Sequence, residues 1–285
     1  MIWAALASFV ILVFLRFQIA LAIGISSMIA IVFFSDLSLL VLAQRLVVGV
    51  DSYVFLAIPL FILAGNLMNA GGITDRIFAF ARALIGHFRG GLGHANVLAS
   101  MIFAGMSGSA VAVAGGLGAI EMKAMDAQGY PREFSASITV ASSVIGPVIP
   151  PSIPMVIYGA MAEVSVGRLF LGGILPGVLV AVSLMGLVYI FSVRNNFPRD
   201  QKATFAVFRT RFLESFFPIL TPAVILGGIV LGIFTPTEAA SVAVVYALVL
   251  SLFVYRTVRL KDLPGILIDS MKTTAITTFV MATTS

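Results

Sequence analysis

The sequence contains no cysteine, only two histidines and few charged residues. The absence of cysteine excludes disulfides, thiolate metal sites and cysteine nucleophiles. Charged residues make up 10% of the 285 residues, whereas a soluble domain usually carries about 25%. Because 60% of the residues are apolar, the chain cannot cover a water-facing surface with polar side chains. The composition therefore indicates a membrane protein.

Long runs without charged residues indicate which kind of membrane protein this is. A helix needs about 20 residues to cross about 30 Å of hydrocarbon. Five runs reach that length and two come close to it: 52–74, 95–120, 134–162, 169–193 and 215–237, then 17–35 and 239–255. They predict an all-α polytopic membrane protein. Arg16 interrupts the first apolar region, which leaves open whether residues 1–34 cross once or twice.

The basic residues lie between the runs, so the net charge of +5 is no signal for nucleic acid. Five of them fall within residues 194–214, against two acidic residues, and the positive-inside bias places this loop in the cytoplasm. The next run then ends on the opposite side near "FTPTEAAS" at 234–241, and the following run returns to a basic loop at Arg256. In "TPTEAAS", Thr235 and Glu238 fit a helix-capping box, with Pro236 at the first helical position.

Residues 73–90 have the pattern of an amphipathic arm helix along the membrane surface, with Thr74 as its expected N-cap. Glycines then loosen the chain before "AGMSGSAVAVAGGLG" at 104–118, where 11 of 15 residues are Gly, Ala or Ser. Such a stretch fits a tightly packed helix crossing. It also fits a re-entrant hairpin with its tip at 107–109 and arms of about 12 residues. Glu121 would then lie back on the side where the hairpin starts.

Residues 141–159, "ASSVIGPVIPPSIPMVIYG", carry four prolines within eight apolar residues. Each proline removes a backbone donor and interrupts a helix. Irregular backbone at membrane depth is tolerated where it is buried in protein or lines a cavity. A broken helix also presents free carbonyls at one half and free amides at the other, which secondary transporters use for ions and substrates. A packing kink needs one proline, so four prolines favour a discontinuous helix.

Several long motifs resemble one transporter family. They are "QRLVVGVDSYVFLAIPLFILAGNLMNAGGITDRI" (44–77), "GGLGHANVLASMIFAGMSGSAVA" (90–112), "GPVIPPSIPMVIYG" (146–159), "GRLFLGGILPG" (167–177) and "GIFTPTEAASVAVVYAL" (232–248). The chain is similar to the large membrane subunit (DctM-like) of a TRAP transporter, the tripartite ATP-independent periplasmic family. The resemblance implies an inverted-repeat secondary transporter of the elevator type, with a re-entrant hairpin and a discontinuous helix. That subunit is longer, so we expect this chain to be truncated after the first repeat.

The resemblance also implies function and partners. It implies a sodium-coupled importer of organic acids such as C4-dicarboxylates, sialic acid or other sugar and keto acids, in the bacterial inner membrane. A periplasmic substrate-binding protein and a small TRAP membrane subunit would be its partners, with sodium as coupling ion and no other cofactor. The implied domains are 1–72 (N-terminal scaffold helices), 73–90 (arm helix), 91–165 (transport-domain hairpin and broken helix), 166–233 (connecting helices) and 234–285 (start of the second repeat).

The family motifs fall on two groups of candidate residues. The hairpin motif places sodium ligands at Ser107, Gly108 and Ser109. The broken-helix motif places the ion and substrate cavity at the following residues: Gly146, Pro150, Pro151, Ser152 and Pro154. The family usually has an aspartate after the hairpin tip, where this chain has Val113. A carboxylate would neutralise a bound cation, so its absence is expected to weaken that sodium site or change its stoichiometry.

The sequence contains no recognisable catalytic site. "GMSG" at 105–108 matches the serine motif of rhomboid proteases, but the two histidines, His87 and His94, both precede it and neither lies on a later span. No Walker motif is present, so the energy source is not expected to be ATP. A stand-alone sodium–anion symporter of related fold and a non-transporting membrane scaffold remain as alternatives.

Overall fold

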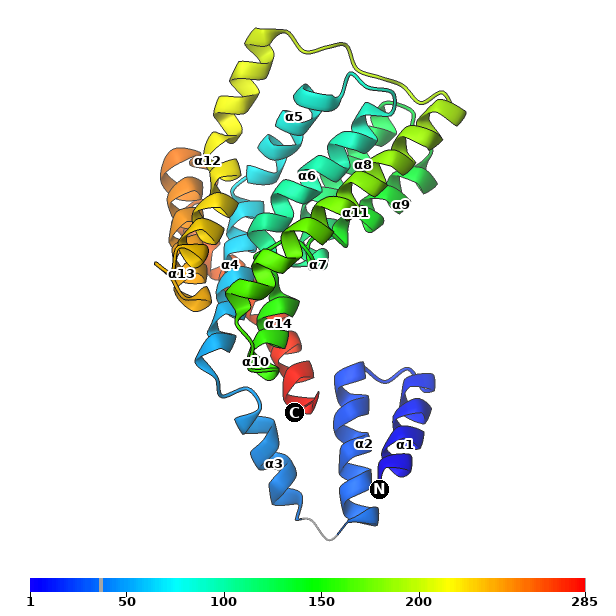
Figure 1. The fold of residues 1–285 in the computed structure, drawn as a ribbon, viewed down its shortest axis with the longest axis vertical. Helices are drawn as coiled ribbons and strands as arrows, with labels where there is room; N and C mark the ends of the chain where they lie inside the picture. The colour runs from blue at the N-terminus through cyan, green and yellow to red at the C-terminus, as the bar shows by residue number, and fades with distance from the viewer. Residues whose placement is uncertain (36–37, 285) are drawn as a thin grey trace. The chain divides into compact units, whose positions relative to one another are not determined.

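The structure is a computed structural model that describes residues 1–35 and 38–284. All regular elements in these residues are helical. The chain divides into two compact units, Met1–Phe55 with Met271–Ser285, and Leu56–Ser270 (Figure 1). The boundary falls within α14, Leu263–Thr284.

The first unit contains three short apolar helices besides the end of α14. They are α1 (Ile2–Phe14), α2 (Ile19–Phe34) and α3 (Leu39–Val48). The chain reverses at Arg16, whose φ of 63° is left-handed, and α1 packs against α2. Residues 1–34 therefore form two helices of 13 and 16 residues, each shorter than the about 20 residues of a full crossing.

In the described part of the chain, four helices are long and apolar enough to cross a membrane: Tyr53–Ala70, Val166–Arg194, Phe205–Val230 and Pro236–Val254. The first consists of η1 (Tyr53–Leu56) and α4 (Ala57–Ala70), and the last of α13 (Pro236–Val249) and a π-helical turn, η3 (Leu250–Val254). The second and third are α11 (Val166–Arg194) and α12 (Phe205–Val230). α13 packs on α4 through buried alanines, which let the two backbones approach closely.

Helix α5 (Ile73–Ile85) packs against α6 (Gly91–Ser107) and α12 with Ile73, Ile77 and Phe80 buried. Its N-cap is Gly72, with a φ of 62°, and not Thr74. The expectation of a threonine cap was wrong because the positive φ of Gly72 lets the helix begin at Ile73, which places Thr74 inside the first turn and buries it.

The runs 95–120 and 134–162 are not single helices. The first becomes α6 (Gly91–Ser107), a turn, α7 (Ala110–Ala112), the π-helix η2 (Val113–Leu117) and α8 (Gly118–Ala127). The second becomes α9 (Arg132–Ser143), an irregular segment and α10 (Ile153–Met161). α6 has 17 residues and not the expected 12, because it begins at Gly91 inside the glycine-rich segment.

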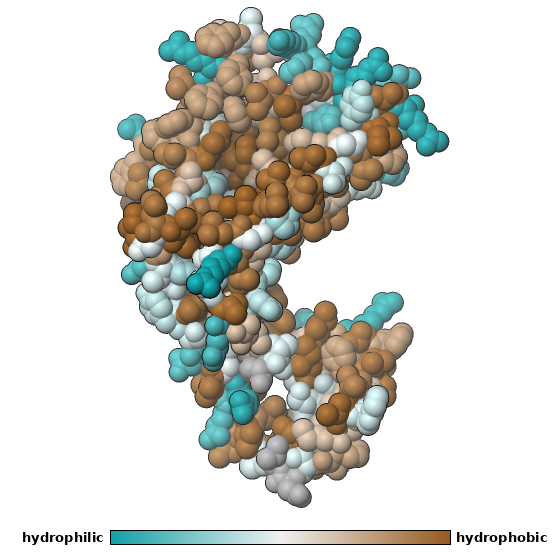
Figure 2. Space-filling view, viewed as in Figure 1, coloured by the Kyte–Doolittle hydropathy of each residue, from teal (hydrophilic) through white to brown (hydrophobic). Residues whose placement is uncertain are grey.

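Side-chain polarity in the second unit follows the expected topology. Figure 2 shows apolar side chains over α11 and α12, and hydrophilic ones gathered where α11 ends and α12 begins. The exposed residues of α11 include Leu175, Leu179 and Ile190. A helix that exposes such residues along its length needs an apolar surrounding, as a bilayer supplies.

Candidate functional site

The hairpin turns at Gly108. α6 ends at Ser107, Gly108 has a φ of 60°, and the Gly108 amide donates to the Ala104 carbonyl at 3.1 Å. Ser109 is extended, and its hydroxyl accepts a long bond from the Ala112 amide at 3.4 Å, so the next helix begins there. The left-handed φ explains a glycine at this position, because other residues adopt it only with strain.

The proline-rich segment breaks the second run between Ser143 and Ile153. Ser152 organises the new helix start: its hydroxyl accepts from the Met155 amide at 3.3 Å and donates to the Pro147 carbonyl. The Pro150–Pro151 peptide bond is cis. The discontinuous helix predicted from the prolines is thus present in the structure.

The hairpin turn and the helix break touch each other. The Ile153 amide donates to the Gly108 carbonyl at 3.3 Å. A Cβ atom at Gly108 would lie 2.5 Å from the Pro151 carbonyl oxygen, and one at Gly146 would lie 3.0 Å from the Ser109 carbonyl carbon. We call this contact region, residues 107–109 with 146–153, the junction.

The predicted site residues other than Pro154 lie at the junction. Pro154 is exposed and lines a separate surface groove with Tyr158 and Met161. Ser107 lies against α4, where a Cβ at Gly65 would come within 3.2 Å of the Ser107 Cβ. Pro150 approaches α6, since its carbonyl oxygen lies 3.7 Å from the Cβ position of Gly105.

Helix ends of opposite polarity meet at the junction. α6 ends at Ser107 and α9 at Ser143, and the last carbonyls of each helix have no partner within it. α10 begins at Ile153, whose amide donates to the Gly108 carbonyl; Pro154 has no amide hydrogen, and the Met155 amide donates to the Ser152 hydroxyl. The helix dipoles make the ends of α6 and α9 partly negative and the start of α10 partly positive, which favours a cation near the former and an anion near the latter.

Buried oxygen atoms without a partner suit a hard cation. Four side-chain oxygens among the described residues are buried and make no hydrogen bond. They are the Ser107 and Thr274 hydroxyls, the Asn69 amide oxygen and one Glu121 carboxylate oxygen. Ser107 therefore offers an uncommitted hydroxyl beside the carbonyl end of α6, which fits an ion bound through oxygens. Within residues 1–35 and 38–284, no cluster of three or more His, Asp or Glu could hold a metal.

Val113 is buried, with 1% exposure, at the first residue of the π-helix η2. π-Helical turns are frequent at functional sites. The turn brings Gly116 against α4, where a Cβ would lie 2.3 Å from the Asn69 side chain. No local pattern in the sequence singled out Asn69, because its proximity to residues 113–117 arises from the packing of two helices.

A buried polar cluster behind the junction was also missed. The Asn96 amide nitrogen contacts a Glu121 carboxylate oxygen at 2.6 Å and the Thr139 hydroxyl at 2.8 Å. The Ser142 hydroxyl lies 2.7 Å from the Asn96 amide oxygen and accepts from Ser100 at 3.0 Å. Glu121 is fully buried. The cluster joins α6, α8 and α9.

The loop between α11 and α12 is fixed by a charged cluster around Asp200. Arg82 donates twice to the Asp200 carboxylate, at 2.6 and 3.0 Å, and Gln128 donates at 2.6 Å. Burial opposes ionisation of Asp200, but the hydrogen bonds from Arg82 and Gln128 outweigh it and hold the pKa of its carboxyl below the ordinary value. Nearby, Tyr130 donates to the Pro198 carbonyl at 3.1 Å, and burial raises the pKa of Tyr130 to about 12.

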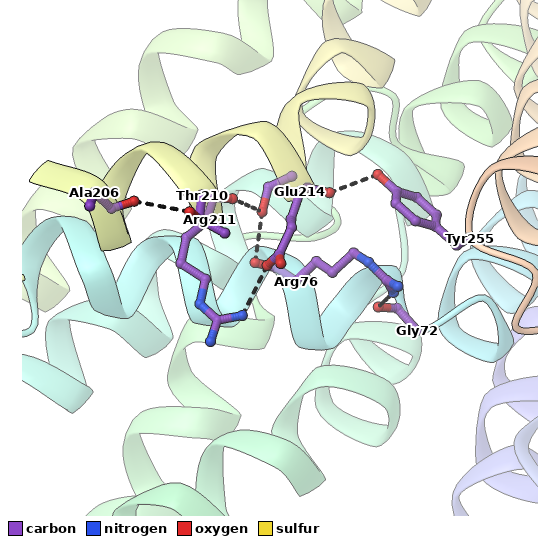
Figure 3. Close-up of polar contacts among 8 residues, drawn as sticks. Gly72, Arg76, Ala206, Thr210, Arg211, Glu214 and Tyr255 are labelled. Atoms are coloured by element: carbon purple, nitrogen blue, oxygen red, sulfur yellow. Dashed lines mark hydrogen bonds and ion pairs between the residues drawn. The ribbon is translucent and has the colours of Figure 1, made fainter.

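Arg76 links the α4–α5 corner to α12 and to the chain after η3 (Figure 3). Its guanidinium donates to the Gly72 carbonyl at 2.7 Å and lies 4.0 Å from the centre of the Tyr255 ring. Tyr255 donates to the Glu214 carbonyl at 2.7 Å, and Ser215 donates to the Arg76 carbonyl at 2.8 Å. These contacts hold α5, which carries Arg82, against α12.

Thr235 and Glu238 form the predicted capping box at the start of α13. The Thr235 hydroxyl accepts from the Glu238 amide at 3.3 Å, and the Glu238 carboxylate accepts from the Thr235 amide at 2.8 Å, with Pro236 at the first helical position. Glu238 is exposed and bonds only within this box, so it has a capping role.

Curated relatives of this chain are membrane permeases. It is 47% identical over 240 residues to the sialic acid TRAP transporter permease protein SiaT of Haemophilus influenzae, covering 84% of this chain and 39% of the relative. It is 46% identical to the sialic acid TRAP transporter large permease protein SiaM of Vibrio cholerae, over 82% of this chain and 55% of the relative. It is 41% identical to the C4-dicarboxylate TRAP transporter large permease protein DctM of Pseudomonas aeruginosa, over 92% of this chain and 61% of the relative.

The chain thus spans about half the length of the curated relatives it matches. These relatives are named as transporters and not as enzymes. The family model described as "Tripartite ATP-independent periplasmic transporter, DctM component" matches residues 6–285. The chain therefore belongs to the DctM family of TRAP transporter membrane components.

Proposed function

We propose that this chain forms the first part of a large TRAP permease subunit that imports an organic acid by sodium symport. The observation that carries the proposal is the direct contact of the two interrupted segments, in which the Ile153 amide bonds to the Gly108 carbonyl at 3.3 Å. Two interruptions that meet inside an apolar protein create one polar site, as in other secondary transporters.

The substrate is proposed to be a carboxylate. Relatives are named for sialic acid, C4-dicarboxylates and 2,3-diketo-L-gulonate, all of which are organic acids. In this chain the start of α10 is the end that favours an anion, and Ser152 fixes its first turn. The substrate would meet this helix end, with the binding protein selecting which acid is delivered.

Sodium is proposed as the coupling ion, held near Ser107 and the carbonyl end of α6. The buried, unpaired Ser107 hydroxyl supports this assignment. The hairpin and broken helix of residues 91–165 would belong to the moving part of an elevator, residues 1–72 would belong to its scaffold, and residues 166–233 would be connecting helices. The hairpin would then be re-entrant in the bacterial inner membrane. A small TRAP membrane subunit and a periplasmic binding protein would complete the transporter.

Uptake by proteoliposomes tests this proposal. They would hold the large subunit that contains this chain, with or without the small subunit and the binding protein. We expect uptake of a labelled organic acid that requires a sodium gradient and the binding protein. Uptake without the binding protein would favour the stand-alone symporter. The absence of uptake under every gradient, with well-folded protein, would favour the scaffold.

Val113→Asp tests the sodium assignment. An aspartate here would be buried, and a bound cation would stabilise its ionised form, so we expect several-fold tighter sodium activation and a melting temperature that rises with sodium. Val111→Asp is the matched control, because Val111 is 78% exposed two residues away. If sodium alters neither uptake nor melting of Val113→Asp more than of the control, Val113 does not line the ion site.

A further inference from the structure

We propose that Glu121 is a buried proton-binding site, and that the orientation of the Asn96 amide depends on whether this proton is present. The inference does not rest on the proposed substrate or on sodium. It rests on the buried cluster of Asn96, Glu121, Thr139 and Ser142, which joins the hairpin to α9.

The first step concerns charge. Glu121 is fully buried, one carboxylate oxygen bonds only to Asn96, and the other has no partner. α8 packs against α6, α9 and η2. The titratable or charged residues are His94 on α6 and Arg132 and Glu133 on α9, and η2 has none. On α8 itself, the other charged residues are Lys123 and Asp126. Among described residues none forms an ion pair with Glu121.

An ionised carboxylate in this place would be a buried charge without a counter-charge, which costs several kcal/mol by general estimates. Uptake of one proton from water removes that charge. The proton comes from a hydronium ion, whose O–H bond breaks as a bond forms between the proton and one carboxylate oxygen; a water molecule is left and no other covalent bond changes. The proton then needs an acceptor, and the amide of Asn96, 2.6 Å away, is the group in contact.

The second step concerns the amide. The oxygen and nitrogen of an asparagine side chain have nearly the same shape, so their positions follow from the bonds around them. If the amide turns by half a rotation, the Asn96 oxygen faces Glu121 and Thr139 and accepts from both. The Asn96 nitrogen then donates to the Ser142 hydroxyl, whose hydrogen is taken by the Thr139 carbonyl at 3.1 Å.

Each orientation leaves one hydrogen of the cluster without a partner: the Thr139 hydroxyl hydrogen in one, an amide hydrogen in the other. The two orientations therefore leave the same number of hydrogens unpaired, and charge decides between them. The turned amide pairs with a protonated Glu121, and the unturned amide with an ionised one. Loss of the proton would thus rearrange the bonds that tie α6, α8 and α9 together.

Infrared spectroscopy of the purified chain in lipid nanodiscs tests the proposal. Glu121 is the one buried glutamate among the five of the chain, all of which lie in the described residues. With ¹³C-labelled glutamate at neutral pH, we expect one glutamate in five to show the carbonyl band of a protonated acid, shifted by the label. The other four should show carboxylate bands.

Two variants complete the test. Glu121→Gln should remove the protonated band, while Glu133→Gln, at an exposed glutamate on α9, should leave it. If Glu121→Gln does not fold, the infrared spectrum of the isotope-labelled wild-type chain still tests the proposal. A wild-type spectrum with only carboxylate bands at neutral pH overturns the proposal. It is also overturned if sodium converts the protonated band into a carboxylate band, because the site would then bind a metal cation.

Discussion

The junction region and the Asp200 cluster, both in the second unit, hold their helices together by different means. At the junction, backbone atoms approach so closely that Gly108 has no room for a Cβ and Gly146 has little. Behind it, Glu121 relies on amide and hydroxyl neighbours. At Asp200, a partly exposed arginine and a carboxylate form a two-bond ion pair, with side chains 42% and 20% exposed.

The difference follows from access to water. An ion pair near water loses little solvation, whereas a charge in the packed interior loses most of it. The interior therefore uses shape and neutral hydrogen bonds, in which single atoms have large effects. The cluster at the loop uses charges, whose effects are smaller and depend on pH and salt.

Gly108→Ala should have the largest effect. The new methyl group would meet the Pro151 carbonyl oxygen at 2.5 Å, and the residue would have to keep a φ of 60°. The two costs together should lower the free energy of unfolding by about 3 kcal/mol, measured by thermal or denaturant unfolding in detergent.

Gly115→Ala is the control, because no atom lies within 4 Å of its Cβ position and its φ is not positive. We expect it to be neutral or slightly stabilising, since alanine favours a helix over glycine. Equal destabilisation by both variants would show that close approach at the junction contributes nothing specific.

Asn96→Leu should come second. Leucine has a similar size but cannot bond, so Glu121, Thr139 and Ser142 would each lose a contact inside the protein. Leaving buried polar groups unpaired should cost about 2 kcal/mol, measured in the same unfolding assay.

Asn195→Leu is the matched exchange at an exposed asparagine, whose side chain bonds only to the Phe191 carbonyl. It should change stability by no more than about 0.5 kcal/mol. A similar loss at both positions would mean that the cluster behind the junction is no more important than a surface contact.

The sequence allowed the interruptions to be predicted, because they depend on local chemistry. Glycine at 108 and the prolines at 147–154 act on the backbone where they stand, and so does the capping box at Thr235. That the two interruptions touch was not predicted, since no local pattern specifies a contact between Gly108 and Ile153.

The polar clusters were not predictable in the same way. Asn96 is 25 residues from Glu121 and 43 from Thr139, and Arg82 is 118 from Asp200. Which faces of these helices meet depends on packing. Glu121 also follows a run of small apolar residues and precedes a lysine, a pattern typical of a helix leaving the membrane, so its burial had no signal in the sequence.

Asp200→Asn should have the smallest effect of the three. Asparagine keeps the shape and one acceptor but loses the charge, so the cost at neutral pH should be about 1 kcal/mol after allowance for exposure. Because the folded pKa of Asp200 is lowered, its stabilisation is fully present above the ordinary aspartate value of about 3.9. It is lost as pH falls through the folded pKa.

The wild-type chain should therefore be more stable than Asp200→Asn at neutral pH, and this difference in stability should disappear on acidification. Melting curves from neutral pH to about pH 3 measure it. Asp126→Asn, at an exposed aspartate on α8, should follow the wild type throughout. Added salt should narrow the wild-type advantage at neutral pH but leave the effect of Asn96→Leu unchanged. If salt reduced both effects equally, the two regions would not differ in their access to water, and the contrast between them would fail.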